Sequence, residues 1–551
     1  MQRLLPLIGV TCSLALTACG GGKGSADSVV PDARANTGVT TSSVVPTPAP
    51  SSDPLPTSAK ALYISPTGSD SADCKSASTP CKTFASVFAK LPAGGELVLL
   101  DGTYTPSTTG VIHWDTGTYT SKSAQIPSGT ASSSTYVHAL NPGKAIINGP
   151  MWMGRSSRKD SYISVRGLRF EGGVVFYNTS FVTLKETGVH GALDMGTNDG
   201  DWGNTDNLVE DVWVWASGER GIVSNYRSHR NVWRRLVVRG DGCGTSACAG
   251  DGNPNIGLTV YDSHDVSVQN VIVLDRILMP TDGPYADFSI ASHTGMTSSG
   301  ADYRFGRNEW LGTISLNAPD TAYYMEPDSS TTVGDSSNPT VRISNAVAWN
   351  AAGGGFNFAR AGQYFKIENL VSHVKGGDAV RVAPELAGLG SLNNVIVLGT
   401  GRFGLNSAIT PSYVNVNGSF SSGVYNQTTP TNVVSGDPLV GGALQYVTRI
   451  ESTTTAPRLF GTGSGGANIG ATVLNRYGTD GTRYGQSGYN ALTSNALWPW
   501  PNQARIKSEM CANTTRGFCS TGKRLDGANP VTLTSYVWEI AGKPTVYNQD
   551  F

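Results

Sequence analysis

The chain has 551 residues, of which 67 are glycine and only 15% are charged, and its formal net charge is −1. A charge this close to zero excludes recognition of nucleic acid or of an anionic membrane by a global electrostatic field. Serine, threonine, asparagine and glycine are abundant, whereas long runs of helix-forming residues are missing, so the composition predicts a turn-rich, all-β extracellular protein.

Residues 1–18 have the composition of an export signal. A basic start at Arg3 precedes an apolar run, Leu4 to Leu16, that is too short to span a membrane. The run ends in Leu-Thr-Ala-Cys at 16–19, which resembles the lipobox of bacterial lipoproteins. The resemblance implies cleavage before Cys19 and lipidation of that cysteine. The alternative is an ordinary signal peptide with a stray cysteine.

The residues after Cys19 are Gly20 and Gly21 rather than aspartate, which by the same resemblance favours the outer membrane. Residues 19–58 lack hydrophobic periodicity and are rich in proline and serine. They are expected to be a flexible tether between the anchor and a folded domain.

Apart from Cys12 in the signal and Cys19, the chain has six cysteines, which form three closely spaced pairs, none with the CxxC spacing of a metal site. Local pairing with none left over is typical of an oxidising compartment. We expect disulfides between Cys74 and Cys81, between Cys243 and Cys248, and between Cys511 and Cys519.

A short pattern recurs from residue 162 to residue 398: an apolar residue, two polar positions, an apolar centre and another apolar residue two places on. The centres are Leu168, Thr187, Val212, Leu236, Val271, Ala346, Leu370 and Val395. Most neighbouring centres lie 24 or 25 residues apart, as from 187 to 212 and from 212 to 236. The interval from 271 to 346 is three such periods, so two further repeats are expected within it.

A period near 25 with two short strands and a polar corner predicts a parallel β-helix, in which stacked coils share one core. The residue before the centre is Asp211, Arg235, Asn270, Asn345, Asn369 and Asn394 in six of the repeats. Asparagines stacked at a tight inward corner can bond to the backbone and to one another. This column resembles the asparagine ladder of right-handed parallel β-helix proteins of the pectate-lyase-like superfamily.

The resemblance extends to the N-terminal side. Residues 62–104 are similar to the opening cap of these proteins, with Phe84, Val87, Phe88 and Leu91 on one face of a capping helix, and 134–149 resembles a first full coil. The prediction is an all-β, right-handed parallel β-helix of about 10–12 coils over residues 59–440.

Residues 441–551 leave the repeat and are expected to pack on the β-helix or cap its end. The Trp-Pro-Trp-Pro stretch at 498–501 is expected to be extended, and the chain then to turn helical. A second helix is predicted after Thr532 as its cap, with Leu533, Tyr536, Val537 and Ile540 on one face. No strand alternation is visible in this tail.

Five arginines lie close together between Asn225 and Gly242. Column positions place Arg235 beside Asp211 and Arg234 beside Glu210 of the preceding coil, which predicts structural ion pairs between coils. Arg227 and Arg230 flank the turn before the repeat and are expected to be solvated.

Arg239 lies in an outward column instead. The columns one and three places after the centre carry Trp213, Trp215, Trp349, Arg239, His190 and His373. Sugar rings stack on indoles, and a guanidinium binds a carboxylate, so these residues can form an exposed glycan groove near Trp213 and Arg239. The alternative is that another segment, such as the C-terminal tail, covers this face.

The chemistry that fits the superfamily is β-elimination of a uronate polymer, which requires a base and neutralisation of the substrate carboxylate. The catalytic candidates are Arg239, His229 and His190, and Asp199 and Asp201 are candidate calcium ligands in an oxygen-rich loop. Hydrolysis by two carboxylates is a less favoured reaction, to which Asp194 or Glu171 could contribute.

The sequence therefore predicts a surface-anchored, monomeric polysaccharide lyase with possible calcium dependence. The alternative is a non-catalytic β-helix lipoprotein that binds glycan or builds the cell surface. In both cases the partner is a polysaccharide or cell-surface glycan, and the protein contacts the membrane through its lipid.

Overall fold

The computed structural model describes residues 61–196, 203–216, 221–241, 255–277, 285–292, 307–327, 339–359, 364–382, 390–399, 402–404, 411–416, 431–435, 450, 453, 459–520 and 531–541. The predicted lipobox with Cys19 and the predicted tether at 19–58 lie outside these residues, as do Asp199, Asp201, Cys243 and Cys248.

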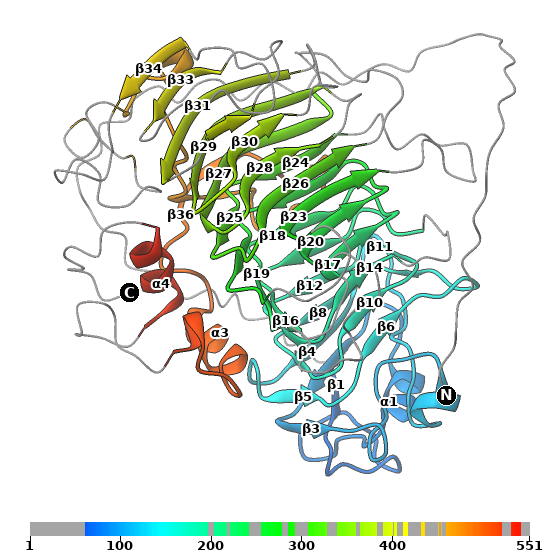
Figure 1. Ribbon diagram of the computed structural model, residues 1–551. Coiled ribbons are helices and arrows are strands. Elements are labelled where there is room, and N and C mark those ends of the chain that lie inside the picture. The colour runs from blue at the N-terminus through cyan, green and yellow to red at the C-terminus, as the bar shows by residue number, and fades with distance from the viewer. Residues whose placement is uncertain are drawn as a thin grey trace, which may run out of the picture. The chain divides into compact units, whose positions relative to one another are not determined.

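The described residues form two large parallel sheets, one of 22 strands and one of ten strands (Figure 1). In the larger sheet each coil contributes two strands that meet at a corner. The first strands are β1 (Leu62–Ile64), β2 (Glu96–Leu99), β4 (Thr135–Ala139), β8 (Ile163–Arg166), β12 (Thr183–Lys185), β15 (Leu208–Glu210), β18 (Val232–Arg234), β21 (Val266–Gln269) and β24 (Asn308–Leu311). The second strands are β3 (Gly102–Tyr104), β5 (Ala145–Ile147), β9 (Arg169–Phe170), β13 (Gly188–His190), β16 (Trp213–Ala216), β19 (Val237–Gly240), β22 (Ile272–Leu274) and β25 (Ile314–Leu316).

Later coils run through the corner as single long strands, and the ten-stranded sheet forms the remaining wall. The long strands are β27 (Val341–Ala351), β29 (Phe365–Val374) and β31 (Gly390–Gly399), followed by β33 (Ser412–Val416) and β34 (Thr431–Ser435). The ten-stranded sheet contains β6 (Met151–Met153), β10 (Val174–Phe176), β14 (Leu193–Met195), β17 (Gly221–Tyr226), β20 (Asn255–Tyr261), β23 (Tyr285–Ser292), β26 (Thr321–Pro327), β28 (Gly354–Phe358), β30 (Asp378–Val382) and β32 (Arg402–Gly404). The predicted parallel β-helix is confirmed.

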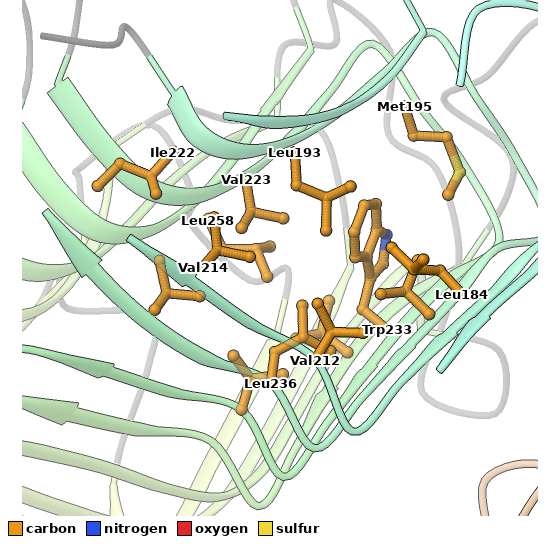
Figure 2. Close-up of a cluster of buried hydrophobic side chains, with 14 of the residues drawn as sticks. Leu184, Leu193, Met195, Val212, Val214, Ile222, Val223, Trp233, Leu236 and Leu258 are labelled. Atoms are coloured by element: carbon orange, nitrogen blue, oxygen red, sulfur yellow. The ribbon is translucent and has the colours of Figure 1, made fainter. Parts of the chain in front are cut away.

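The core follows from the alternation of side chains along each strand, because every second residue points inward. Leu184, Val209 and Trp233 occupy one inward column in consecutive coils, and all are fully buried. Figure 2 shows side chains of different walls meeting inside the coil, with Trp233 facing Leu193 and Met195. One coil alone cannot enclose such side chains, so stacking is what creates the core.

The corner between the two strands of a coil is a single residue with a left-handed backbone. Its φ is 57° at Asp211, 54° at Arg235, 47° at Asn270 and 54° at Asn345, and Gly312 with φ 65° fills the same position in another coil. Asparagine, aspartate and glycine adopt this conformation most readily, which explains the predicted polar column.

Asn345, Asn369 and Asn394 lie at equivalent positions of consecutive strands, as predicted, and the side chains of this column bind the C-terminal tail. Asn270 accepts from the backbone N–H of Tyr477 at 2.6 Å, and Asn345 donates to the Tyr477 hydroxyl at 2.7 Å. Asn369 donates to the carbonyl of Asn468 at 2.7 Å, and Asn394 accepts from the backbone of Ser464 at 2.8 Å. The predicted column is therefore confirmed, and its amides bond to backbone groups and to a tyrosine hydroxyl of the tail.

A buried asparagine stack that was not predicted lies at another corner. Asn207 donates to Asn231 at 3.2 Å, and Asn231 donates to Asn225 at 3.1 Å. All three are fully buried, so these amides satisfy one another away from water.

The expectation of two repeats between Val271 and Ala346 was also wrong. The strand β24 pairs with β21 on one side and with β27 on the other, so a single coil, with Thr313 at its centre, fills the interval. The extra length belongs to the connections around this coil rather than to another pair of corner strands.

The N-terminal helix and the local disulfide agree with prediction. Helix α1 (Phe84–Lys90) is capped by Thr83, whose hydroxyl accepts from the backbone of Ser86 at 3.1 Å. Phe84, Val87, Phe88 and Leu91 are buried. Cys74 and Cys81 form a disulfide, as do Cys511 and Cys519 in the tail. A short helix, α2 (Thr116–Tyr119), follows in an insertion before the first full coil.

The C-terminal tail packs along the coil, where Figure 1 shows its helices beside the stacked strands. Both predicted helices are present, as α3 (Gln503–Met510) and α4 (Leu533–Ile540), and Thr532 caps the second. A two-stranded antiparallel sheet of β35 (Asn475–Tyr477) and β36 (Leu492–Ala496) was not predicted. In the described part of the chain, no helix has the length and apolarity needed to cross a membrane.

Candidate functional site

The outward columns of the second strands are arranged as predicted. His190, Trp215, Arg239 and Leu274 are register partners in consecutive coils, and the same column continues through Trp349 and His373. Whether such a column can meet a ligand depends on what covers it.

The C-terminal tail covers most of it. Trp213, Trp215 and Trp349 belong to one buried apolar cluster together with Trp498 and Trp538 of the tail. The indole nitrogen of Trp213 donates to Glu509 Oε2 at 2.9 Å. The predicted exposed groove around these tryptophans is therefore absent, because the apolar column is an interface within the chain.

Arg239 is part of that interface and is 1% exposed. Its guanidinium makes two bonds to Asp241, at 2.6 and 2.8 Å, and donates to the carbonyl of Met510 at 2.7 Å. It also lies 2.6 Å from Cys519 Sγ. With its donors committed to carboxylate and tail, Arg239 cannot bind a substrate carboxylate, so its predicted catalytic and binding roles were wrong.

Three other arginines of the stretch are paired with carboxylates as well. Arg235 binds both oxygens of Asp211, at 2.6 and 2.8 Å, and Arg234 binds Glu210 at 2.7 Å, which confirms the two predicted pairs. Arg230 pairs with Asp206 at 2.8 Å, whereas it was expected to be only solvated.

His229 lies in the turn between β17 and β18, at a different corner of the coil from Arg239. Its ring stacks on that of His264, with ring centroids 4.8 Å apart. Burial, and next the charge of His264, lower the pKa of His229 to about 4. The ring of His373 stacks on that of Trp349, with ring centroids 4.5 Å apart, next to the face that the tail covers. The structure therefore does not bring these two histidines together with Arg239.

The column is open at its N-terminal end, where His190 has a side chain that is 40% exposed. His190 Nδ1 lies 2.7 Å from Glu171 Oε2, and Arg169 Nη2 lies 2.5 Å from Glu171 Oε1. The imidazole stacks on Trp215 with ring centroids 5.2 Å apart. Strands β9 and β13 and the turn after β9 hold these groups on neighbouring coils.

This arrangement orients the histidine as a base. A carboxylate only accepts hydrogen bonds when ionised, so the neutral form of the imidazole carries its proton on Nδ1 and has its lone pair on Nε2. Burial alone would raise the pKa of Glu171, but the hydrogen bond from His190 and the charge of Arg169 outweigh it and lower that pKa. Glu171 therefore stays ionised and fixes the tautomer of His190.

Arg169 was not recognised as a site residue from the sequence. Its Nε is buried and has no hydrogen-bond partner among the described residues, while its guanidinium lies 5.8 Å from the Trp215 ring centroid. The signal was its position two residues before Glu171, since alternate residues of a strand share a face.

The predicted calcium ligands Asp199 and Asp201 lie outside the described residues. Across the described ranges, no three His, Cys, Asp or Glu side chains are grouped so as to hold a metal ion.

No protein-family model and no curated protein matches the chain. Among solved structures, it is similar to pectate lyase Pel9A at 14% identity and a TM-score of 0.34, over 74% of this chain and 95% of that one. A rhamnogalacturonan lyase matches at 12% identity and a TM-score of 0.27, over 72% and 94% of the two chains. The polysaccharide lyase Pedsa3628 of family PL6 from Pseudopedobacter saltans matches at 12% identity and a TM-score of 0.33, over 64% and 91%.

Proposed function

We propose that this chain is an exported, lipid-anchored protein that binds an acidic polysaccharide and cleaves it by β-elimination at the dyad of Glu171 and His190. The proposal is carried by the 2.7 Å contact between Glu171 Oε2 and His190 Nδ1 on a part of the outward column where His190 remains solvent-accessible. An oriented imidazole with a free Nε2 is the base that this reaction requires.

In the proposed reaction, His190 Nε2 takes the proton from C5 of a uronate residue. The electron pair of that C–H bond forms a double bond between C4 and C5, while the bond from C4 to the glycosidic oxygen breaks. The leaving oxygen takes a proton from water. Arg169, whose side chain is 20% exposed beside the dyad, stabilises the charge that develops on the uronate carboxylate.

A non-catalytic, glycan-binding role is the second candidate, and a specific contact favours it. Arg169 already forms an ion pair with Glu171 at 2.5 Å, which uses part of the positive charge that the substrate carboxylate needs. A protein with this arrangement can bind an acidic glycan without lowering the barrier to proton removal.

Export is supported by chemistry that is independent of the dyad. The disulfides Cys74–Cys81 and Cys511–Cys519 are typical of proteins that fold in an oxidising compartment. The lipobox at 16–19 supplies the proposed anchor.

The test is to incubate the purified protein with pectate, alginate and neutral polysaccharides and to follow the absorbance of the unsaturated uronate end. His190→Gln is expected to lower the rate by about 100-fold or more, as loss of a general base does. Glu171→Gln is expected to lower it less, because the base remains but its tautomer is no longer fixed.

A matched control is His264→Gln, because His264 Nδ1 also lies 2.8 Å from a carboxylate, that of Asp265, at another corner of the coil. This variant should keep the wild-type rate. Binding of a uronate polymer with no unsaturated product would favour the non-catalytic role, and equal activity of wild type and His190→Gln would refute the assignment of the base.

A further inference from the structure

An aromatic row lies on the outside of the ten-stranded sheet at its N-terminal end. The backbone N–H of Trp152 donates to the carbonyl of Ile112 at 2.9 Å, so the segment around Ile112 adds a further level below β6. The rings of His113 and Trp152 are 5.5 Å apart, and those of Trp152 and Tyr177 are 5.9 Å apart. Rings at such spacings follow the stacking of the coils.

The row has an exposed indole at its side. Trp114 is 38% exposed, and the guanidinium carbon of Arg155 lies 6.0 Å from its ring centroid. Arg155 is itself exposed. A solvent-accessible indole beside a cation presents an apolar face and a positive charge together, which suits a sugar ring that carries a carboxylate.

Two buried polar groups lie in this row. The indole Nε1 of Trp152 is buried without a hydrogen-bond partner among the described residues. His113 Nδ1 accepts from the backbone N–H of Asp115 at 2.9 Å, so the neutral ring carries its proton on Nε2. Burial lowers the pKa of His113 to about 4, against a smaller opposing effect of Asp115, and the ring is therefore neutral at pH 7.

The segment that carries these residues is an insertion with its own support. Asp115 caps α2 by accepting from the backbone of Gly117 and Thr118 at 3.0 and 3.1 Å. Tyr119 from the end of α2 packs on His113 with ring centroids 4.4 Å apart. The insertion thus holds Trp114 in place without needing that side chain for the core.

We infer that Trp114, Trp152 and Arg155 form a binding subsite for one uronate residue of the polysaccharide, with the sugar ring on Trp114 and its carboxylate at Arg155. The inference rests on the proposed function for the class of polymer, but not on the dyad, because the subsite binds and does not react. Nothing in its chemistry requires the polymer to be cleaved.

The test measures binding of pectate and alginate oligosaccharides, and of a neutral oligosaccharide of equal length, by titration calorimetry on the intact chain. Trp114→Ala is expected to weaken uronate binding about tenfold, and Trp114→Phe to weaken it less, because loss of a stacked ring amounts to roughly that factor. Arg155→Ala should weaken uronate binding and leave any binding of the neutral oligosaccharide unchanged.

Tyr136→Ala is the matched control, because Tyr136 is 37% exposed but lies in β4, on the larger sheet. It should bind as the wild type does. Unchanged affinity of Trp114→Ala, an equal loss in Tyr136→Ala, or a wild-type protein that binds neither uronate oligosaccharide would overturn the subsite.

These outcomes are separable from the proposed function. Loss of binding in Trp114→Ala together with no cleavage by the wild type supports the subsite and refutes the lyase reaction. Cleavage that depends on His190, with unchanged affinity of Trp114→Ala, refutes the subsite and leaves the lyase reaction standing.

Discussion

At the scale of residues, arginines that look like binding or catalytic groups in the sequence form ion pairs within the fold instead. Arg234 and Arg235 have fully buried side chains, and each has acidic partners on the preceding coil or in the tail. Removing one partner of a buried ion pair costs far more than removing an exposed pair, because the remaining charge cannot return to water. The arginine cluster is therefore sensitive to mutation for reasons of folding.

We predict that Arg235→Ala lowers the free energy of unfolding by about 3–5 kcal/mol, because it leaves Asp211 buried without its bidentate partner. Arg239→Ala should act in the same direction, since it removes the buried guanidinium that bonds to Asp241 and to the carbonyl of Met510. Urea unfolding measures both, with the exposed Lys159→Ala as the control. Wild-type stability of Arg235→Ala would contradict the structural role of this pair.

The second prediction at this scale concerns pH and His229. Its folded pKa of about 4 lies below the ordinary value of about 6.5, so the folded state binds protons less readily than the unfolded state. The groups that face it are His264, Asp265, Asp206 and Arg230. Stability from neutral His229 is fully present above about pH 6.5 and is lost as pH falls toward about 4, by up to about 3 kcal/mol.

Urea unfolding of wild type and His229→Gln at about pH 7 and about pH 4.5 measures this contribution as the difference in their pH dependence. The variant should lose less stability on acidification than the wild type. Parallel losses in the two proteins would show that His229 does not contribute.

At the scale of elements, the asparagine corner joins two parts of the fold. The left-handed backbone forms the turn, while the free amide binds the tail segment between Ser464 and Tyr477. Asparagine thus forms the turn of the coil and also binds the tail segment that covers the coil. These two roles explain why the column is polar although it borders an apolar interface.

We predict that Asn345→Gly loosens the tail by about 1–3 kcal/mol, because it keeps the turn but removes the bonds to the Tyr477 hydroxyl and from the backbone of Thr472. Asn345→Ala should cost about 1 kcal/mol more, since alanine disfavours the positive φ of 54°. Hydrogen exchange of residues 468–477 reports the loosening.

Asn502→Gly is the control for this experiment, because Asn502 has a φ of 58° but makes no capping bond with its side chain. It should leave exchange in 468–477 unchanged. If Asn345→Gly behaves as Asn502→Gly does, the amide does not hold the tail.

At the scale of the whole molecule, the proposed lipid anchor makes a prediction of its own. We expect Cys19→Ser to move the protein from the membrane fraction to the soluble fraction, because the proposed lipidation requires the thiol of Cys19. Cys12→Ser, which lies within the apolar run of the signal, should leave the distribution unchanged. An unaltered distribution of Cys19→Ser would refute lipidation.

The sequence by itself determined the coil. Each strand buries every second residue, and each corner needs a residue with a left-handed backbone. Both requirements recur once per coil, so the sequence shows them as a regular repeat. The helices α1 and α4 were predictable for the same reason, since their caps at Thr83 and Thr532 and their apolar faces lie within a few residues of one another. The disulfides Cys74–Cys81 and Cys511–Cys519 are local as well.

Only the tertiary structure decided which outward face is open. Trp213 and Glu509 are 296 residues apart, and Arg239 and Met510 are 271 residues apart, yet each pair is in contact. An apolar outward column has the same local sequence pattern whether a glycan or another segment of the chain covers it. The pattern indicates that the face is shielded from water, but it does not indicate which partner shields it. The tail covers Arg239 and leaves His190 accessible.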